Sequence, residues 1–125
     1  MKKVYVKDIM HKITVIDATS SVAEAAKIMA EKNIGSVMVR EEGEIDGILT
    51  ERDILKKVVS KELDPRTTNV SEVMTKHPLI IDAKATIEDA AEIFNTVHIR
   101  RLPVLQRGEI VGIITSRDVA RAIGK

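Results

Sequence analysis

The chain has no cysteine, very few aromatic residues and no long hydrophobic run, and each shortage excludes a class of protein. Without cysteine there are no disulfides, thiolate nucleophiles or thiolate metal ligands. Aromatic residues make up 2% of the chain, namely Tyr5 and Phe94, so a planar ligand must contact aliphatic side chains rather than aromatic stacking platforms. No apolar run approaches bilayer length, and the charged start has no apolar segment behind it. We therefore expect a cytoplasmic protein with no membrane anchor.

The charge balance is close to neutral, with 20 Lys and Arg against 19 Asp and Glu and a net charge of +1. A protein whose affinity depends on neutralising many phosphates usually carries a clear basic excess, so nucleic-acid binding is disfavoured. The 125 residues, of which 44% are hydrophobic, suffice for one compact domain with one core but hardly for two independent domains.

The clearest feature of the sequence is an internal repeat with an offset of about 65 residues. The stretch GILTERD at 47–53 aligns with GIITSRD at 112–118, and VKDIM at 6–10 aligns, one residue out of phase, with VSEVM at 70–74. We therefore predict one repeat at residues 1–60 and a second at residues 70–125. The segment 61–69 between them is polar and interrupted by Pro65, as is typical of a linker.

Each repeat predicts the same order of elements, a short strand, a helix, two strands and a second helix. Capping boxes mark the starts of the first helices, and glycines mark the turns between the paired strands. In the first repeat we expect strands at 13–16, 36–40 and 45–50, a helix from Ser21 to about Lys32, a turn at Gly43, and a last helix with an apolar stripe of Ile54, Leu55, Val58 and Val59. In the second repeat we expect strands at 79–81, 101–105 and 110–115, a helix from Thr86 to about Val97 and a turn at Gly108. The predicted fold class is α+β, with two βαββα repeats.

The shared stretch at the end of the last strand is the best candidate for a binding site. A helix start offers unpaired N–H groups that suit a phosphate, and a nearby carboxylate can accept the two hydroxyls of a ribose. The threonine supplies a hydroxyl, the aspartate a ribose clamp and the arginine a phosphate contact. Thr-x-x-Asp is also an ordinary capping box, and Arg52 and Arg117 can equally be solvated. Gly47 and Gly112 indicate either close approach of a ligand to the backbone or close packing of a helix.

The sequence offers no catalytic or metal site. His11, His77 and His98 do not sit four residues apart on a predicted helix, and no cysteine supports them as ligands. No phosphate-binding Walker loop, nucleophile elbow or zinc-protease motif occurs. We predict neither an enzyme nor a protein with a catalytic cofactor.

The doubled GI(L/I)TxRD stretch, the two Val-x-x-x-Met segments and the IRRLPV run at 99–104 resemble a tandem pair of CBS domains, named for cystathionine β-synthase. The resemblance covers nearly the whole chain. It implies a pseudo-two-fold symmetric pair of βαββα repeats with two clefts between them. It also implies regulatory binding of AMP, ADP, ATP or S-adenosylmethionine.

The resemblance implies ligand contacts at specific positions of each repeat. The threonine and aspartate of the shared stretch would contact phosphate and ribose, with the carboxylate left free of the helix cap. Basic residues before the Leu-Pro-Val strand would contact phosphate in the second repeat, where the first has Gly35 and Ser36, unless they are ordinary exposed residues at a strand start. The predicted nucleotide-binding residues are Thr50, Asp53, Arg100, Arg101, Thr115, Arg117 and Asp118, with Ile13 and Pro78 against the adenine and His77 near a phosphate.

These features predict a regulatory, energy-sensing module that binds an adenosine compound and signals to an effector protein. Its amphipathic helices offer more apolar surface than the intramolecular pairing can cover, so we expect a homodimer. The alternative is a ligand-free scaffold that dimerises or docks onto an enzyme or transporter.

Overall fold

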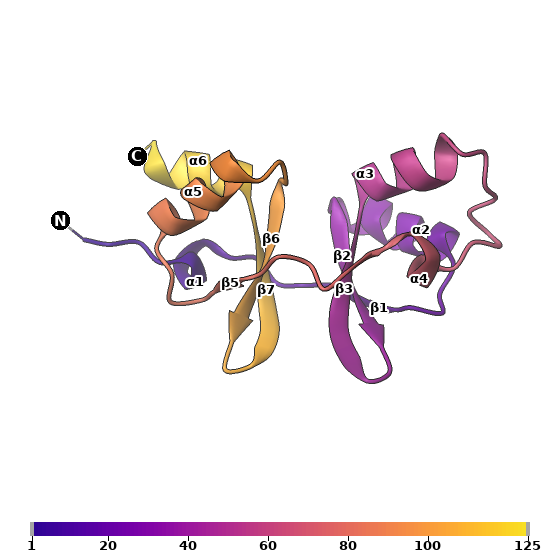
Figure 1. The fold of residues 1–125 in the computed structure, drawn as a ribbon, viewed down its shortest axis with the longest axis horizontal. Helices are drawn as coiled ribbons and strands as arrows, with labels where there is room; N and C mark the ends of the chain where they lie inside the picture. The colour runs from indigo at the N-terminus through magenta and orange to yellow at the C-terminus, as the bar shows by residue number, and fades with distance from the viewer. Residues whose placement is uncertain (1, 125) are drawn as a thin grey trace. The chain divides into compact units, whose positions relative to one another are not determined.

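The computed structural model describes residues 2–124, which form two compact units (Figure 1). The central unit comprises residues 14–78, and the C-terminal unit comprises residues 79–124 together with residues 2–13 from the start of the chain. None of the helices in the described part combines the length and apolar character that a membrane span requires.

The central unit contains a four-stranded sheet in the order β1-β2-β3-β4. Strand β1 runs parallel to β2, and β3 is antiparallel to both of its neighbours, β2 and β4. Four short or medium helices accompany the sheet. The elements are β1 (Val15–Asp17), α2 (Val22–Lys32), β2 (Ser36–Glu41), β3 (Glu44–Thr50), α3 (Glu51–Ile54), the π-helix η1 (Leu55–Val59), α4 (Val70–Val73) and β4 (Thr75–Lys76).

The C-terminal unit repeats this plan with a three-stranded sheet in the order β5-β6-β7. Strand β5 is parallel to β6, and β6 is antiparallel to β7. Its elements are α1 (Val6–Ile9), β5 (Ile81–Asp82), α5 (Ile87–Thr96), β6 (Arg101–Gln106), β7 (Glu109–Thr115) and α6 (Ser116–Ile123). The α+β class predicted from the sequence is confirmed.

The short helix at the start of each sequence repeat belongs to the unit built from the other repeat. In Figure 1 the indigo helix α1 lies among the orange and yellow elements of the C-terminal unit. The backbone N–H of Val6 donates to the carbonyl of Ala85 (2.8 Å), as that of Val70 in α4 donates to the carbonyl of Ser20 (2.8 Å). The two equivalent segments thus make equivalent contacts in opposite units, and the compact units follow different boundaries from the sequence repeats.

The prediction of one core is wrong, because each unit buries its own hydrophobic cluster. In the central unit Val70 and Val73 of α4 pack with α2 and the sheet, and in the C-terminal unit Val6 of α1 packs with α5, α6 and the sheet. The exchanged helices supply the residues that complete each cluster. A unit of this size can therefore bury a separate core.

Local signals in the sequence place most elements correctly. Ser21 and Thr86 cap α2 and α5 through capping boxes, as predicted. Gly43 and Gly108 have φ values of 82° and 79°, and the residue before each also has a positive φ, which is the backbone of a tight type I′ hairpin turn. The predicted hairpins are confirmed at both positions.

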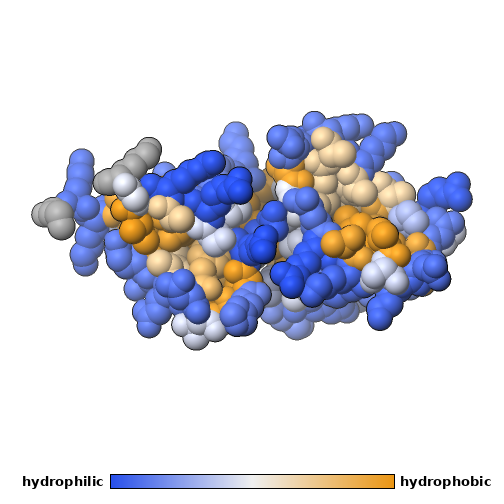
Figure 2. Space-filling view, turned by 90° about the horizontal axis from the view of Figure 1, so that it is seen from above, coloured by the Kyte–Doolittle hydropathy of each residue, from blue (hydrophilic) through white to orange (hydrophobic). Residues whose placement is uncertain are grey.

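The apolar stripe predicted for the last helix of the first repeat is only partly buried. Val58 is fully buried, whereas Leu55 and Val59 are each 61% exposed. Residues 55–59 form a π-helix directly after the single turn of α3, and Leu55 and Val59 lie four residues apart on the outer side of it. Figure 2 shows apolar surface of this kind among the charged side chains on both units.

Candidate functional site

The shared stretch forms a strand-to-helix junction in each unit. In the central unit Thr50 ends β3 and caps α3, and its Oγ1 accepts from the backbone N–H of Asp53 (3.2 Å). The Asp53 Oδ2 in turn accepts from the backbone N–H of Thr50 (2.9 Å) and from the Thr50 hydroxyl (3.1 Å). Both side chains are half-buried. The junction is therefore a complete capping box.

The junction of the C-terminal unit has the same geometry. Asp118 N–H donates to Thr115 Oγ1 (3.1 Å), and Thr115 N–H donates to Asp118 Oδ2 (3.0 Å). The expectation that the carboxylates stay free of the cap is wrong for both repeats. The reason is local, since an aspartate at the third helical position reaches back to the N–H of the capping residue.

Asp118 has a second partner that comes from the start of the chain. The Nε2 atom of His11 lies 3.1 Å from Asp118 Oδ2, and the Asp118 side chain is 16% exposed. Burial by itself would raise the pKa of Asp118, but hydrogen bonds from His11 and Thr115 outweigh it and hold the pKa below its ordinary value. The carboxylate is therefore ionised at neutral pH.

Asp53 has a different second partner, a lysine of its own helical segment. Lys57 Nζ lies 3.2 Å from Asp53 Oδ1 and also donates to the backbone carbonyl of Val73 in α4 (3.0 Å). The two junctions thus share a capping box but differ in the cation beside the carboxylate.

The predicted basic residues of the second repeat lie next to the junction in the C-terminal unit. Arg101 is the register partner of Thr115 in the β6–β7 pair, and the backbone N–H of Ser116 donates to the carbonyl of Arg100 (2.9 Å). In the central unit the same positions hold Ser36, opposite Thr50, and Gly35. The fold therefore places the backbones of Arg100 and Arg101 beside Thr115 and Ser116, while Arg52 and Arg117 are exposed on the first turns of their helices.

The other predicted contact residues belong to neither capping box. Ile13 and Pro78 are half-buried at the chain segments where the two units meet in sequence. His77 is exposed, has a left-handed backbone with φ of 49°, and pairs through Nδ1 with the carboxylate of Asp46. Among residues 2–124 no three His, Asp or Glu side chains come together as a metal-binding group.

Gly47 and Gly112 make room for protein side chains. A Cβ atom at Gly47 would lie 2.7 Å from Met74 Sδ, and one at Gly112 would lie 2.6 Å from Met10 Sδ. The structure supports close packing at these glycines, rather than close approach of a ligand to the backbone. It also connects two motifs of the sequence, because the methionine of each Val-x-x-x-Met segment lies on the glycine of a GI(L/I)TxRD stretch.

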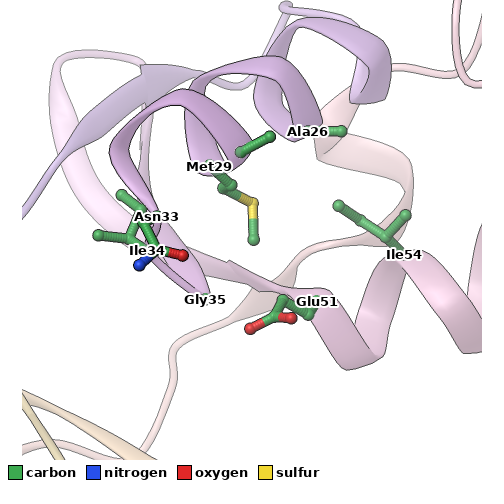
Figure 3. A pocket seen from close by; sticks show the side chains of 8 residues that line it. Ala26, Met29, Asn33, Ile34, Gly35, Glu51 and Ile54 are labelled. Carbon is green, nitrogen blue, oxygen red and sulfur yellow. The ribbon is translucent and has the colours of Figure 1, made fainter.

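The central unit has a cavity of about 360 Å³ between α2 and α3, beside the junction (Figure 3). Its walls are mostly aliphatic, with Asn33 and Glu51 as polar members. The C-terminal unit has a separate cavity of about 410 Å³ along α5. None of the predicted site residues lines either cavity, so these hollows do not coincide with the junctions.

Two residues of the junctions were missed by the sequence reasoning as partners of the aspartates. Lys57 follows Asp53 by four residues, a spacing at which oppositely charged side chains meet on a helix, so this signal was available. In the sequence His11 stands out only as a possible metal ligand. No sequence pattern connects it to Asp118, because the contact depends on the packing of α1 in the C-terminal unit.

Comparisons with known proteins agree on one family. The CBS domain family model matches residues 6–60 and 70–125. The CBS domain-containing protein YhcV of Bacillus subtilis is 34% identical over 116 residues, which are 92% of this chain and 82% of that protein.

Solved structures of similar chains have the same fold. A hexameric CBS-CP12 protein from bloom-forming cyanobacteria superposes with a TM-score of 0.90 at 32% identity, covering 99% of this chain and 76% of that one. The crystal structure of Hypoxic Response Protein I with two coordinated zinc ions superposes with a TM-score of 0.79 at 31% identity, covering 94% and 97%.

Proposed function

The chain belongs to the CBS-domain family, with two CBS domains in tandem, and on this premise we propose that it binds an adenosine compound and signals to a partner protein. Tandem CBS domains are in general regulatory ligand-binding modules, and stand-alone CBS proteins are in general not enzymes. The proposed ligand is AMP, ADP, ATP or S-adenosylmethionine. The output passes to a separate effector protein.

The observation that carries the proposal is the duplicated junction of threonine and aspartate. Each junction places a hydroxyl and an ionisable carboxylate, both half-buried, at the start of a helix. Such a carboxylate can accept ribose hydroxyls, and a nearby arginine can pair with a phosphate. In the C-terminal unit Arg100 and Arg101 adjoin the junction through β6. Ile13 and Pro78 are the proposed aliphatic contacts for the adenine ring.

Self-association is part of the same proposal. Several large apolar side chains are exposed on each unit, and contiguous apolar surface is typical of sites of protein association. One of the similar structures is described as hexameric. The exposed set in the central unit is Leu55, Val59 and Leu63, and in the C-terminal unit it is Leu79, Ile80, Val97 and Ile123. We propose that two copies pair through such surfaces into a homodimer.

Thermal unfolding with candidate ligands tests the binding proposal. AMP, ADP, ATP, S-adenosylmethionine and NAD are each added at millimolar concentration, and the melting temperature is followed by circular dichroism. A ligand at about 100 times its dissociation constant stabilises the fold by about 2.7 kcal/mol, which raises the melting temperature visibly. No shift with any of the five compounds would overturn the proposal.

A matched pair of variants separates a ligand contact from a helix cap. Asp118→Ala removes both the capping carboxylate and the proposed ribose contact. Asp89→Ala removes only a cap, because Asp89 forms the same capping box with Thr86 at 3.0 and 3.2 Å. Without ligand, we expect both variants to have a lower melting temperature than wild type. Only Asp118→Ala should lose the ligand-induced rise in melting temperature.

The second candidate function is a ligand-free scaffold, and the engagement of both aspartates in capping boxes favours it. On this reading the junctions serve only to start helices, and the exposed apolar residues are the functional surface. The scaffold predicts no melting shift with any nucleotide, together with concentration-dependent association in sedimentation experiments. Leu55→Glu should abolish that association.

A further inference from the structure

The two junctions differ in how many acceptor positions their carboxylates retain. An ionised carboxylate has about four lone-pair sites on its two oxygens. Recognition of a ribose through both of its vicinal hydroxyls requires two of these sites, one for each O–H donor. After the hydrogen bonds within the protein are counted, the two carboxylates retain different numbers of free acceptor sites.

Asp53 has three of its sites occupied by protein donors. Oδ2 accepts from the N–H of Thr50 (2.9 Å) and from its hydroxyl (3.1 Å). Oδ1 accepts from the ammonium group of Lys57 (3.2 Å). One site remains, which is too few for both hydroxyls of a ribose.

Asp118 has two sites occupied, and both are on the same oxygen. Oδ2 accepts from the N–H of Thr115 (3.0 Å) and from Nε2 of His11 (3.1 Å). Within residues 2–124, Oδ1 has no protein partner within hydrogen-bonding distance. This oxygen retains two sites, which matches a vicinal diol.

Lys57 is the residue that creates the difference. Its ammonium group is held from a second side by the carbonyl of Val73, so it is positioned beside Asp53 by two elements of the unit. The corresponding position in the second repeat is Ala122, which cannot supply a cation. An ammonium group that bridges a carboxylate and a carbonyl competes with an incoming hydroxyl for the same acceptor.

We infer that the junction at Asp118 is the one that takes a ribonucleotide, and that Lys57 withholds Asp53 from the same ligand. This inference rests on the proposed function and specifies how many nucleotides each chain binds. The chain binds one nucleotide per molecule although it carries the Thr-Asp pair twice. Lys57 acts as an internal competitor at the second pair.

The test is the stoichiometry of AMP binding by isothermal titration calorimetry. Wild type should bind one AMP per chain. Lys57→Met, which keeps the aliphatic stem and removes the charge, should bind two. Lys56→Met is the matched control, because Lys56 is the exposed neighbouring lysine and does not contact Asp53, and it should bind one. The double variant Lys57→Met/Asp53→Asn should return to one.

The titrations distinguish failure of the Lys57 inference from failure of the nucleotide-binding proposal. Two AMP molecules per wild-type chain, or one per Lys57→Met chain, would overturn the role of Lys57 and leave nucleotide binding standing. No binding of AMP by wild type or by any variant, in a preparation that also shows no melting shift with the other four compounds, would overturn both. A gained site cannot result from misfolding, so the Lys57→Met result is independent of any loss of stability.

Discussion

Gly112 is the position where a single added methyl group tests the packing of α1, from the first repeat, in the C-terminal unit. It lies buried in β7, and a Cβ atom there would be 2.6 Å from Met10 Sδ, 3.0 Å from Met10 Cγ and 3.1 Å from the His11 carbonyl oxygen. Contacts this short require the Met10 side chain to move and the His11 carbonyl to shift by a few tenths of an ångström. In Gly112→Ala we therefore expect α1 to pack less well on the C-terminal unit.

The expected loss of stability follows from two opposing effects. Inserting a methyl group into a packed site costs typically about 1–3 kcal/mol. Alanine in a strand recovers roughly 0.5–1 kcal/mol relative to glycine, because it restricts the unfolded chain. The net loss should be about 1 kcal/mol, with limits of roughly 0 and 2.5 kcal/mol, and each kcal/mol lowers the melting temperature of a small domain by roughly 4–8 °C. Urea unfolding followed by circular dichroism measures this loss.

A double-mutant cycle with Met10→Ala identifies the cause of the loss. Removing the methionine side chain eliminates the two shortest contacts and leaves only the 3.1 Å contact with the His11 carbonyl. Gly112→Ala should then cost less than about 0.5 kcal/mol in the Met10→Ala background, as expected for residues in direct contact. Equal costs of Gly112→Ala in the two backgrounds would refute the packing of Met10 on this glycine.

Two further predictions concern the junction of the C-terminal unit and the last helix of the first repeat. Because the pKa of Asp118 is lowered in the folded protein, its ionised form contributes stability that is complete at neutral pH and is lost as the pH falls through the folded pKa. Asp118→Asn should thus be less stable than wild type in urea at pH 7, with the difference shrinking as the pH falls below the ordinary aspartate pKa of 3.8; a difference that does not change with pH would contradict this. Val58→Ala should cost on the order of 2 kcal/mol because Val58 is fully buried, while Val59→Ala should stay within about 0.5 kcal/mol because Val59 is 61% exposed. Similar losses in the two variants, in protein dilute enough to be monomeric, would disprove the assigned orientation of this helix.

Much of the local structure was predictable because it depends on neighbouring residues. A capping box requires only a hydroxyl and a carboxylate three residues apart, so Ser21, Thr86 and the two junctions were visible in the sequence. The hairpin turns were visible for a similar reason, since a glycine tolerates the positive φ at Gly43 and Gly108.

The burial of the helix after Thr50 was harder to predict. Its apolar residues come in two adjacent pairs, and both pairs fit a helical spacing, so the pattern alone does not show that only Ile54 and Val58 face inward. The number of hydrophobic cores could also not be predicted from the sequence. It depends on whether the halves share a cluster or each completes its own, which α1 and α4 decide.

The two repeats, their order of elements and the Thr-Asp pair at each junction could be predicted from the amino-acid order alone, because they follow from contacts within a few residues or from direct comparison of the copies. Which unit receives each Val-x-x-x-Met segment depends instead on long-range packing. The two segments are alike enough that either would fit either sheet by pattern, and only the folded chain places Met10 on Gly112 and His11 on Asp118. The same packing makes the two junctions unequal, since a distant histidine neighbours one aspartate and a local lysine the other.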